Sequence, residues 1–133
     1  MSISYLIDTD WAIHHLNGNS AVTARLEALQ TEGLGLSVAA LAELYEGVYY
    51  SRDAEESERK LNDFLESLTI VGIDEETARI FGRERGRLRR SGQIIGDMDL
   101  LIAATALQYD CTLLTNNRRH FERIDGLRIE SME

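Results

Sequence analysis

The feature that most constrains the fold is an alternation of short apolar runs with segments of helical spacing. Five runs are predicted as strands, at residues 5–10, 34–38, 69–73, 112–115 and 127–130. Helical patterns fill the intervals at residues 11–16, 21–30, 38–50, 54–68, 74–90 and 99–109. Ser37 and Asp74 are expected to cap the third and fifth of these helices, and the last, which is apolar nearly all round, is expected to be buried on several sides. Strands that alternate with helices favour parallel pairing, with helices on both faces. We therefore expect an α/β fold, a three-layer α/β/α sandwich around a mainly parallel sheet of four to five strands.

Length and composition set further limits. A chain of 133 residues is expected to form a single domain, over residues 1–133. No stretch approaches the ~20 apolar residues that span a bilayer, and the start lacks the features of a signal peptide. Cys111 is the only cysteine, so no intramolecular disulfide is possible, and we expect it to be buried and inert. These features predict a cytoplasmic protein without a membrane partner.

The charge of the chain argues against one class of function. The formal net charge is −9, which is unfavourable for a protein that binds nucleic acid through charge alone. Lys60 is nevertheless the only lysine, and the other basic residues are arginines, which grip phosphate bidentately. These arginines are clustered in the sequence, which leaves room for a local phosphate-binding surface.

Polar residues, most of them acids or amides, follow the predicted strands or lie near the start of the next helix. The carboxyl ends of parallel strands meet at one edge of a sheet, where open α/β sheets bind ligands. Carboxylates gathered there without basic partners would repel one another, and a hard divalent cation such as Mg²⁺ or Mn²⁺ would relieve that repulsion. The residues in question are Asp8, Asp10, Ser37, Glu43, Asp97, Asp99, Thr115, Asn116 and Asn117.

Each of these residues also has a structural interpretation. Asp99 could be only the N-cap of its helix, and Asp8 could be a turn former. Glu43 could be a solvated helix residue, although its apolar neighbours disfavour full exposure. Asn116-Asn117 is a good turn dipeptide by itself. The whole set, in this order, favours the functional interpretation.

Four motifs in this order resemble those of the PIN-domain ribonucleases, and in particular of the VapC toxins of bacterial and archaeal toxin–antitoxin pairs. The motifs are Asp8-Thr9-Asp10, the stretch Leu41-Ala42-Glu43-Leu44-Tyr45-Glu46-Gly47, the stretch from Asp99 to Ala106, and Thr115-Asn116-Asn117 with the following Arg118-Arg119-His120-Phe121. The resemblance covers essentially the whole chain.

The resemblance implies a metal-dependent endoribonuclease with Mg²⁺ or Mn²⁺ as cofactor. Asp8, Glu43 and Asp99 match the three acidic metal-site positions. The fourth catalytic position, often Asp in the family, is Asn117 here, and an amide brings no charge. The family often has Asn or Ser where this chain has Asp10. Attack by an activated water would leave a 5′-phosphate and a 3′-hydroxyl.

The outer shell of the site and the partners follow from the same resemblance and from charge. Asp10, Asp97, Thr9 and Thr115 are candidates to orient ligands or water. An antitoxin segment that carries Arg or Lys would compete with metal and substrate for the acidic pocket. A VapB-like antitoxin and a second copy of the chain, in a homodimer, are the implied protein partners, besides the RNA substrate.

The arginine cluster is the candidate for RNA binding, because an acidic pocket repels RNA unless basic groups hold the flanking phosphates. The alternative is a solvated helical face with a favourable interaction at the helix C-terminus. Trp11, Tyr49 and Tyr50 could stack a base, but partial burial or a subunit contact is the alternative. The candidate RNA-binding residues are Arg83, Arg85, Arg87, Arg89, Arg90 and Arg118, the last with its neighbours Arg119 and His120.

Two other functions compete with the nuclease. Asp8-Thr9-Asp10 also resembles the Asp-x-Asp motif of haloacid-dehalogenase-like phosphatases, which need a lysine near the site; Lys60 lies in a charged helix instead. The other alternative is a catalytically weak PIN-like module that binds RNA, with Asn117 as the disabling change.

Overall fold

The computed structural model describes residues 2–132, so residues 1 and 133 of the expected domain lie outside the described residues. Its centre is a sheet of five parallel strands in the order β3-β2-β1-β4-β5. This confirms the predicted parallel sheet. The strands are β1 (Tyr5–Ile7), β2 (Leu34–Ser37), β3 (Thr69–Val71), β4 (Thr112–Leu114) and β5 (Arg128–Glu130).

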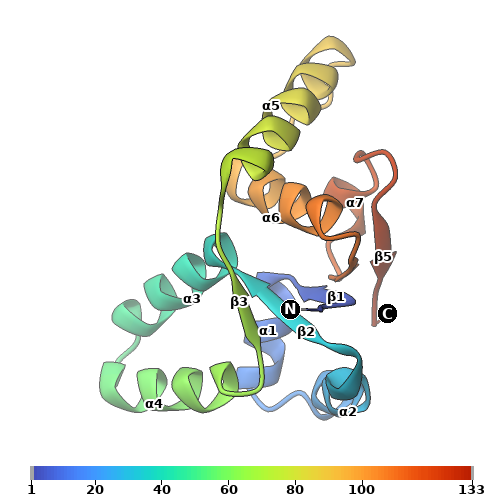
Figure 1. Ribbon diagram of the computed structural model, residues 1–133. Helices are drawn as coiled ribbons and strands as arrows, with labels where there is room; N and C mark the ends of the chain where they lie inside the picture. The colour runs from blue at the N-terminus through green and yellow to red at the C-terminus, as the bar shows by residue number, and fades with distance from the viewer. Residues whose placement is uncertain (1, 133) are drawn as a thin grey trace.

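Helices cover both faces of the sheet, as expected for a three-layer α/β/α sandwich (Figure 1). The chain moves outward from β1 to β2 and β3, and then returns to place β4 and β5 on the other side of β1. Right-handed crossovers in opposite directions put the intervening helices on opposite faces. The first layer holds α1 (Thr9–Leu16), α2 (Ser20–Leu29), α3 (Val38–Tyr50) and α4 (Ala54–Leu65), with a 3₁₀ turn at Gln30–Glu32; the second holds α5 (Glu75–Arg90), α6 (Asp97–Gln108) and α7 (Arg118–Phe121).

Local chemistry explains where several helices begin. The Ser37 hydroxyl accepts a hydrogen bond from the backbone N–H of Ala40 at the start of α3. Asp74 and Thr77 bond reciprocally at the start of α5 in a capping box. Both caps were predicted from sequence, and both are confirmed.

The apolar residues of the strands and of α6 form the core. Leu6, Leu36 and Leu113 on three neighbouring strands are fully buried. Helix α6 is buried on several sides, as its continuous apolar sequence predicted. Cys111 is buried beside this core, as expected, and burial raises the pKa of its thiol to about 11.

Two helix boundaries differ from the expected ones, and one short helix was not expected, in ways that affect the site. Helix α1 begins at Thr9 and not at residue 11, so Asp8 is its N-cap residue. Helix α6 begins at Asp97 with Gly96 as its N-cap, so Asp99 lies inside the first turn and the N-cap interpretation of Asp99 is wrong. Acids are favourable in a first turn because of the helix dipole. The helical turn α7 was not predicted, because four residues give no periodicity to detect.

No helix in the described part of the chain is both long enough and apolar enough to cross a membrane.

Candidate active site

The candidate site lies at the carboxyl ends of β1 and β4, the two central strands. They pair directly, with Ile7 opposite Leu114, and they flank the point where the strand order reverses. Crevices at such points are where open α/β sheets bind ligands. Asp8 follows β1 and Thr115 follows β4, and the Thr115 hydroxyl donates to Oδ2 of Asp8 at 2.7 Å.

Asp8 is a buried carboxyl group whose ionised form is disfavoured by its surroundings. Its side chain is only 4% exposed. Burial raises the pKa of Asp8 to about 7, the charges of Asp10 and Asp99 add to that rise, and the hydrogen bond from Thr115 opposes it. Among residues 2–132, Asp8 forms no ion pair with a basic side chain. A bound cation would supply the missing counter-charge.

Asp10 is held by the backbone on both sides of the site. Its Oδ1 accepts from the N–H of Trp11 at 2.7 Å, and its Oδ2 accepts from the N–H of Asn116 at 3.0 Å. The Thr115 hydroxyl lies 3.4 Å from the same Oδ2. Asp10 therefore links the end of β1 to the end of β4, and its place in the outer shell of a metal site stays a prediction.

Glu43 reaches the site from the second turn of α3. Its Oε1 accepts a 2.6 Å hydrogen bond from the hydroxyl of Thr9 at the start of α1. The side chain is half-buried, so the solvated interpretation of this residue does not hold. Thr9 and Glu43 thus join two helices that begin at the same edge of the sheet.

Asp99 and Asn117 converge on His120, a residue expected only as a neighbour that assists RNA binding. Nδ1 of His120 lies 3.1 Å from Oδ2 of Asp99 and 3.0 Å from Nδ2 of Asn117. One ring nitrogen cannot donate to the carboxylate and accept from the amide at the same time. Asp99 and Asn117 are therefore alternative partners of the same imidazole atom.

The donor set fits a hard divalent cation, although it is not gathered into a closed cage. Asp8, Asp99 and Glu43 supply only oxygen atoms, which suit Mg²⁺ or Mn²⁺. Within residues 2–132, no three His, Cys, Asp or Glu side chains are spaced so that they could hold a metal ion together. Glu43 is bonded to Thr9 and Asp99 to His120, so both carboxylates would have to reorient toward Asp8.

Asp97 lies away from this group. Its side chain is 77% exposed and pairs with Arg85 at 2.6 Å. Residues two apart on a helix point to different sides, so Asp97 and Asp99 do not share a face. A place for Asp97 in the outer shell stays a prediction, and the pairing with Arg85 gives it a different role.

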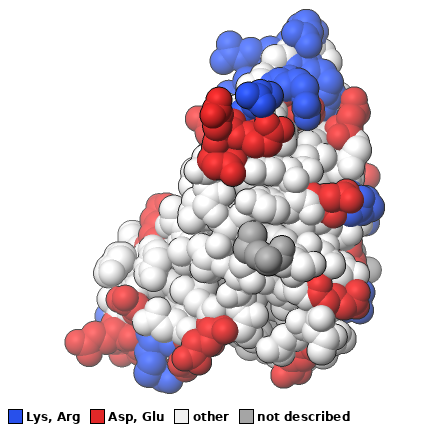
Figure 2. Space-filling view, viewed as in Figure 1, with Lys and Arg blue, Asp and Glu red and all other residues white. Residues whose placement is uncertain are grey.

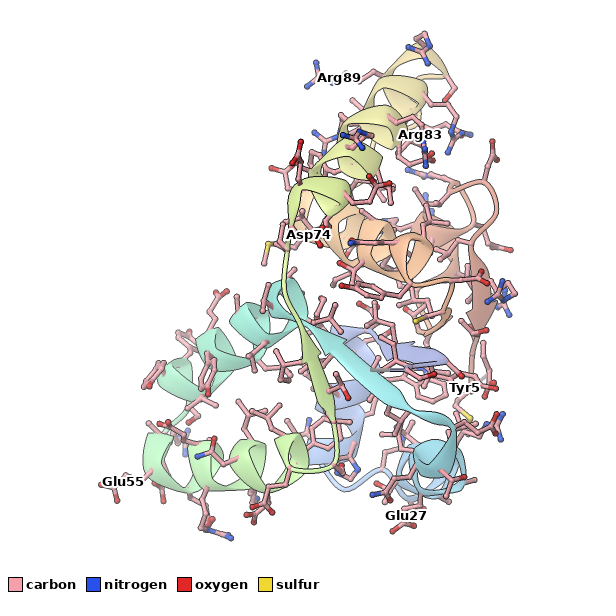
Figure 3. All side chains as sticks on the ribbon, in the orientation of Figure 1. Tyr5, Glu27, Glu55, Asp74, Arg83 and Arg89 are labelled. Atoms are coloured by element: carbon pink, nitrogen blue, oxygen red, sulfur yellow. The ribbon has the colours of Figure 1, made fainter. Side chains whose placement is uncertain are left out.

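The arginines of α5 fall into two groups. Arg85 and Arg87 are bound within the protein, Arg85 to Asp97 and Arg87 to Glu84 and to the backbone oxygen of Arg123. Arg83 and Arg89 project outward from the far half of the helix (Figure 3). Arg90 is also exposed. Figure 2 shows that the end of α5 carries a cap of basic side chains.

Arg118 and Lys60 bear on two earlier expectations. Arg118 begins α7, directly after Asn117, and its side chain is partly exposed; its guanidinium donates to the backbone oxygen of Ile129 and lies 4.0 Å from Glu122. Lys60 is exposed on α4 and, in the part of the chain that is described, pairs with none of the acids of the site. The lysine that a haloacid-dehalogenase-like phosphatase would place beside Asp8 has no counterpart there.

Sequence reasoning missed the role of Trp11 and of Asn116. Trp11 is fully buried, and its indole Nε1–H donates to Oδ1 of Asn116 at 3.0 Å. The sequence alone suggests base stacking, partial burial or a subunit contact for Trp11, and a turn for Asn116. The two residues are 105 positions apart, so no local pattern could have paired them.

Known proteins resemble this chain along nearly its whole length. A model of the PIN domain matches residues 5–127. The chain is 34% identical over 131 residues to Ribonuclease VapC2 of Rickettsia felis, covering 97% of this chain and 98% of that protein. It is 39% identical over 124 residues to Ribonuclease VapC19 of Mycobacterium tuberculosis, covering 92% and 95%.

A solved structure also matches the fold of this chain over nearly its whole length. The crystal structure of VapBC2 from Rickettsia felis, bound to a DNA fragment from their promoter, contains a chain that matches with a TM-score of 0.93 and 33% identity. The match covers 98% of this chain and 100% of that one.

Proposed function

This chain belongs to the PIN-domain family, and we propose that it is a metal-dependent endoribonuclease that serves as the toxin of a VapBC-type toxin–antitoxin pair. The observation that carries the proposal is the state of Asp8: a carboxylate buried at the switch point of the sheet, close to two further acids and, within residues 2–132, without a cationic partner. Ribonuclease VapC relatives at 34% and 39% identity support the substrate class.

Asp8 and Asp99 are the residues that would hold Mg²⁺ or Mn²⁺, with Glu43 and the amide of Asn117 beside them. A cation held there would supply an activated water and neutralise charge that develops on the phosphoryl oxygens. Thr115 keeps the Asp8 carboxylate oriented, and Thr9 holds Glu43 at the entrance. The scissile phosphate would approach along the exposed side, where Asp99 and His120 are accessible.

We assign RNA binding outside the reaction centre to three exposed arginines of α5 and one partly exposed arginine of α7. Arg83, Arg89 and Arg90 on α5 and Arg118 on α7 present guanidinium groups that can grip phosphates bidentately. Arg85 and Arg87 were also candidates, but in this proposal they are structural. Arg85 joins α5 to Asp97 at the start of α6, and Arg87 joins Glu84 of its own helix to the backbone oxygen of Arg123.

The cognate VapB-like antitoxin is the proposed protein partner, in keeping with the VapBC complex that matches this chain. A basic side chain of the antitoxin, placed in the pocket of Asp8 and Asp99, would exclude both metal and RNA. A homodimer and a cytoplasmic location complete the proposal. Co-expression with the product of the adjacent gene should relieve the growth arrest that the chain causes alone, and persistent arrest would contradict the pairing.

The activity is tested by incubating the purified protein with single-stranded RNA, with Mg²⁺, with Mn²⁺ and with a chelator. We expect cleavage only with metal, and none with Asp8→Asn or Asp99→Asn. Hydrolysis of small phosphate esters without RNA cleavage would indicate the phosphatase instead. RNA binding with neither activity would indicate a PIN-like binding module.

A further inference from the structure

We infer that Trp11 is a positioning residue of the proposed nuclease site, acting through the side chain of Asn116 on the segment that carries Thr115 and Asn117. The inference rests on the proposed function. It assigns a role in the chemistry to a buried indole that contacts none of the carboxylates through its ring N–H.

The amide of Asn116 is fixed from two directions. Its Oδ1 accepts the indole N–H of Trp11 at 3.0 Å and the backbone N–H of Met132 at 2.8 Å. Both partners are donors only, and a carbonyl oxygen has two lone pairs, so this arrangement sets the orientation of the amide without ambiguity.

Asp10 closes the link between Trp11 and Asn116 into a ring. Its two carboxylate oxygens accept the backbone N–H groups of these same residues. Trp11 and Asn116 are thus joined once through their side chains and once through Asp10. The end of β4 cannot shift relative to α1 without breaking both connections.

The position fixed by this ring determines where Thr115 points. The Thr115 hydroxyl donates to Asp8 and accepts from the backbone N–H of Asn117 at 2.9 Å. Ser131, which directly follows β5, also holds Thr115, because its hydroxyl donates to the backbone oxygen of Thr115 at 2.6 Å. A small movement of Asn116 would therefore disturb two hydrogen bonds of the neighbouring Thr115 hydroxyl: the one that it donates to Asp8 and the one that it accepts from the backbone N–H of Asn117.

A general stabilising role would predict a different result from a positioning role. Partners that orient metal ligands typically change metal affinity 10–100-fold when they are removed. A residue that only fills the core would lower the melting temperature and leave affinity unchanged in the folded protein. Metal affinity measured well below the melting temperature separates these two roles.

The test measures Mn²⁺ binding to the wild type and to Trp11→Phe. Binding is monitored as the decrease of the electron paramagnetic resonance signal of free Mn²⁺. Phe retains most of the apolar bulk, and the Oδ1 of Asn116 still accepts from the backbone N–H of Met132, so this acceptor is not left unpaired. We expect binding about 10-fold weaker for Trp11→Phe. Asn116→Ala should weaken it similarly, and the double variant should lose little more, because both changes break one link.

Val22→Ala is the matched control, because Val22 is buried on α2 and its side chain takes no part in the hydrogen bonds that join Trp11, Asp10 and Asn116. It should lower the melting temperature and leave Mn²⁺ affinity at the wild-type value. Equal affinity in wild type, Trp11→Phe and Asn116→Ala would overturn the inference and leave the proposed function standing. Absence of Mn²⁺ binding by the wild type would overturn the metal site itself.

Discussion

The hydroxyl of Thr115 donates a 2.7 Å hydrogen bond to the buried carboxylate of Asp8 and so joins the ends of the two central strands. The bond favours the ionised carboxylate, while burial and the charges of Asp10 and Asp99 disfavour it. The outcome is a carboxyl group with a pKa of about 7, which is poised to exchange a proton for a metal ion.

Removing that hydroxyl should weaken metal binding. Thr115→Val deletes the donor to Asp8 at nearly constant volume, so the pKa of Asp8 rises and protons compete better with the cation. We expect Mn²⁺ affinity at pH 7 to fall about 10-fold. Thr115→Ser keeps the donor and should bind as wild type does. Calorimetric titration checks both, and equal affinities for Val and Ser variants would contradict the role of the hydroxyl.

Asp8 should also govern how the stability of the metal-free protein depends on pH. Its pKa is about 7 in the folded protein against an ordinary value of 3.8, so the folded state binds the extra proton between these values. Stability contributed by this group therefore falls as the pH rises through that window and is fully lost above pH 7. Between pH 5 and pH 8 the loss is on the order of 3 kcal/mol.

Chemical denaturation with a chelator present measures this effect by comparing wild type with Asp8→Asn. Asn has no proton to lose and can still accept from Thr115. As the pH rises from 5 to 8, the free energy of unfolding of the wild type should fall relative to that of Asp8→Asn. Parallel pH profiles for the two proteins would rule out a titrating Asp8.

Glu43 should matter more to the reaction than Thr9, its partner. Glu43→Gln removes a charge from the site, and we expect the rate of RNA cleavage to fall by at least about 100-fold, which corresponds to a few kcal/mol of transition-state stabilisation. Thr9→Val only releases Glu43 and should cost about 10-fold. Single-turnover rates with Mg²⁺ distinguish the two, and a larger effect for Thr9→Val would contradict the assignment.

The exposed arginines should be visible in the salt dependence of RNA binding. In the cleavage-deficient Asp8→Asn background, Arg89→Ala should weaken binding and lower the slope of log affinity against log salt by about 0.7 if it contacts one phosphate of a single strand. Arg59→Ala is the control, because Arg59 lies on α4 and is paired with Glu56 and Asp63. Equal slopes for both variants would place the RNA elsewhere.

Local patterns were sufficient for much of this molecule. The apolar runs predicted every strand, and Ser37 and Asp74 were identified as caps because their hydrogen bonds span only three residues. Asp8 was predicted to lie at the carboxyl ends of the strands, because it directly follows the first strand of a parallel sheet. Each of these features depends on neighbours in the sequence.

The remaining features depend on partners that are distant in the sequence. The Trp11–Asn116 pair, the shared Nδ1 of His120 and the Thr9–Glu43 bond link residues that are 105, 21 and 34 positions apart. The division of the α5 arginines into bound and exposed groups depends on where Asp97 and Arg123 lie in space. Periodicity carries no information about such contacts.

The most direct measurement of the central claim is the chemistry of the cut ends when Mg²⁺ is added to metal-free protein and single-stranded RNA. Fragments with a 5′-phosphate and a 3′-hydroxyl should appear only after the addition, and Asp8→Asn should yield none. Cleavage in the presence of chelator, or fragments that end in a 2′,3′-cyclic phosphate, would contradict a carboxylate-bound metal as the source of the attacking water.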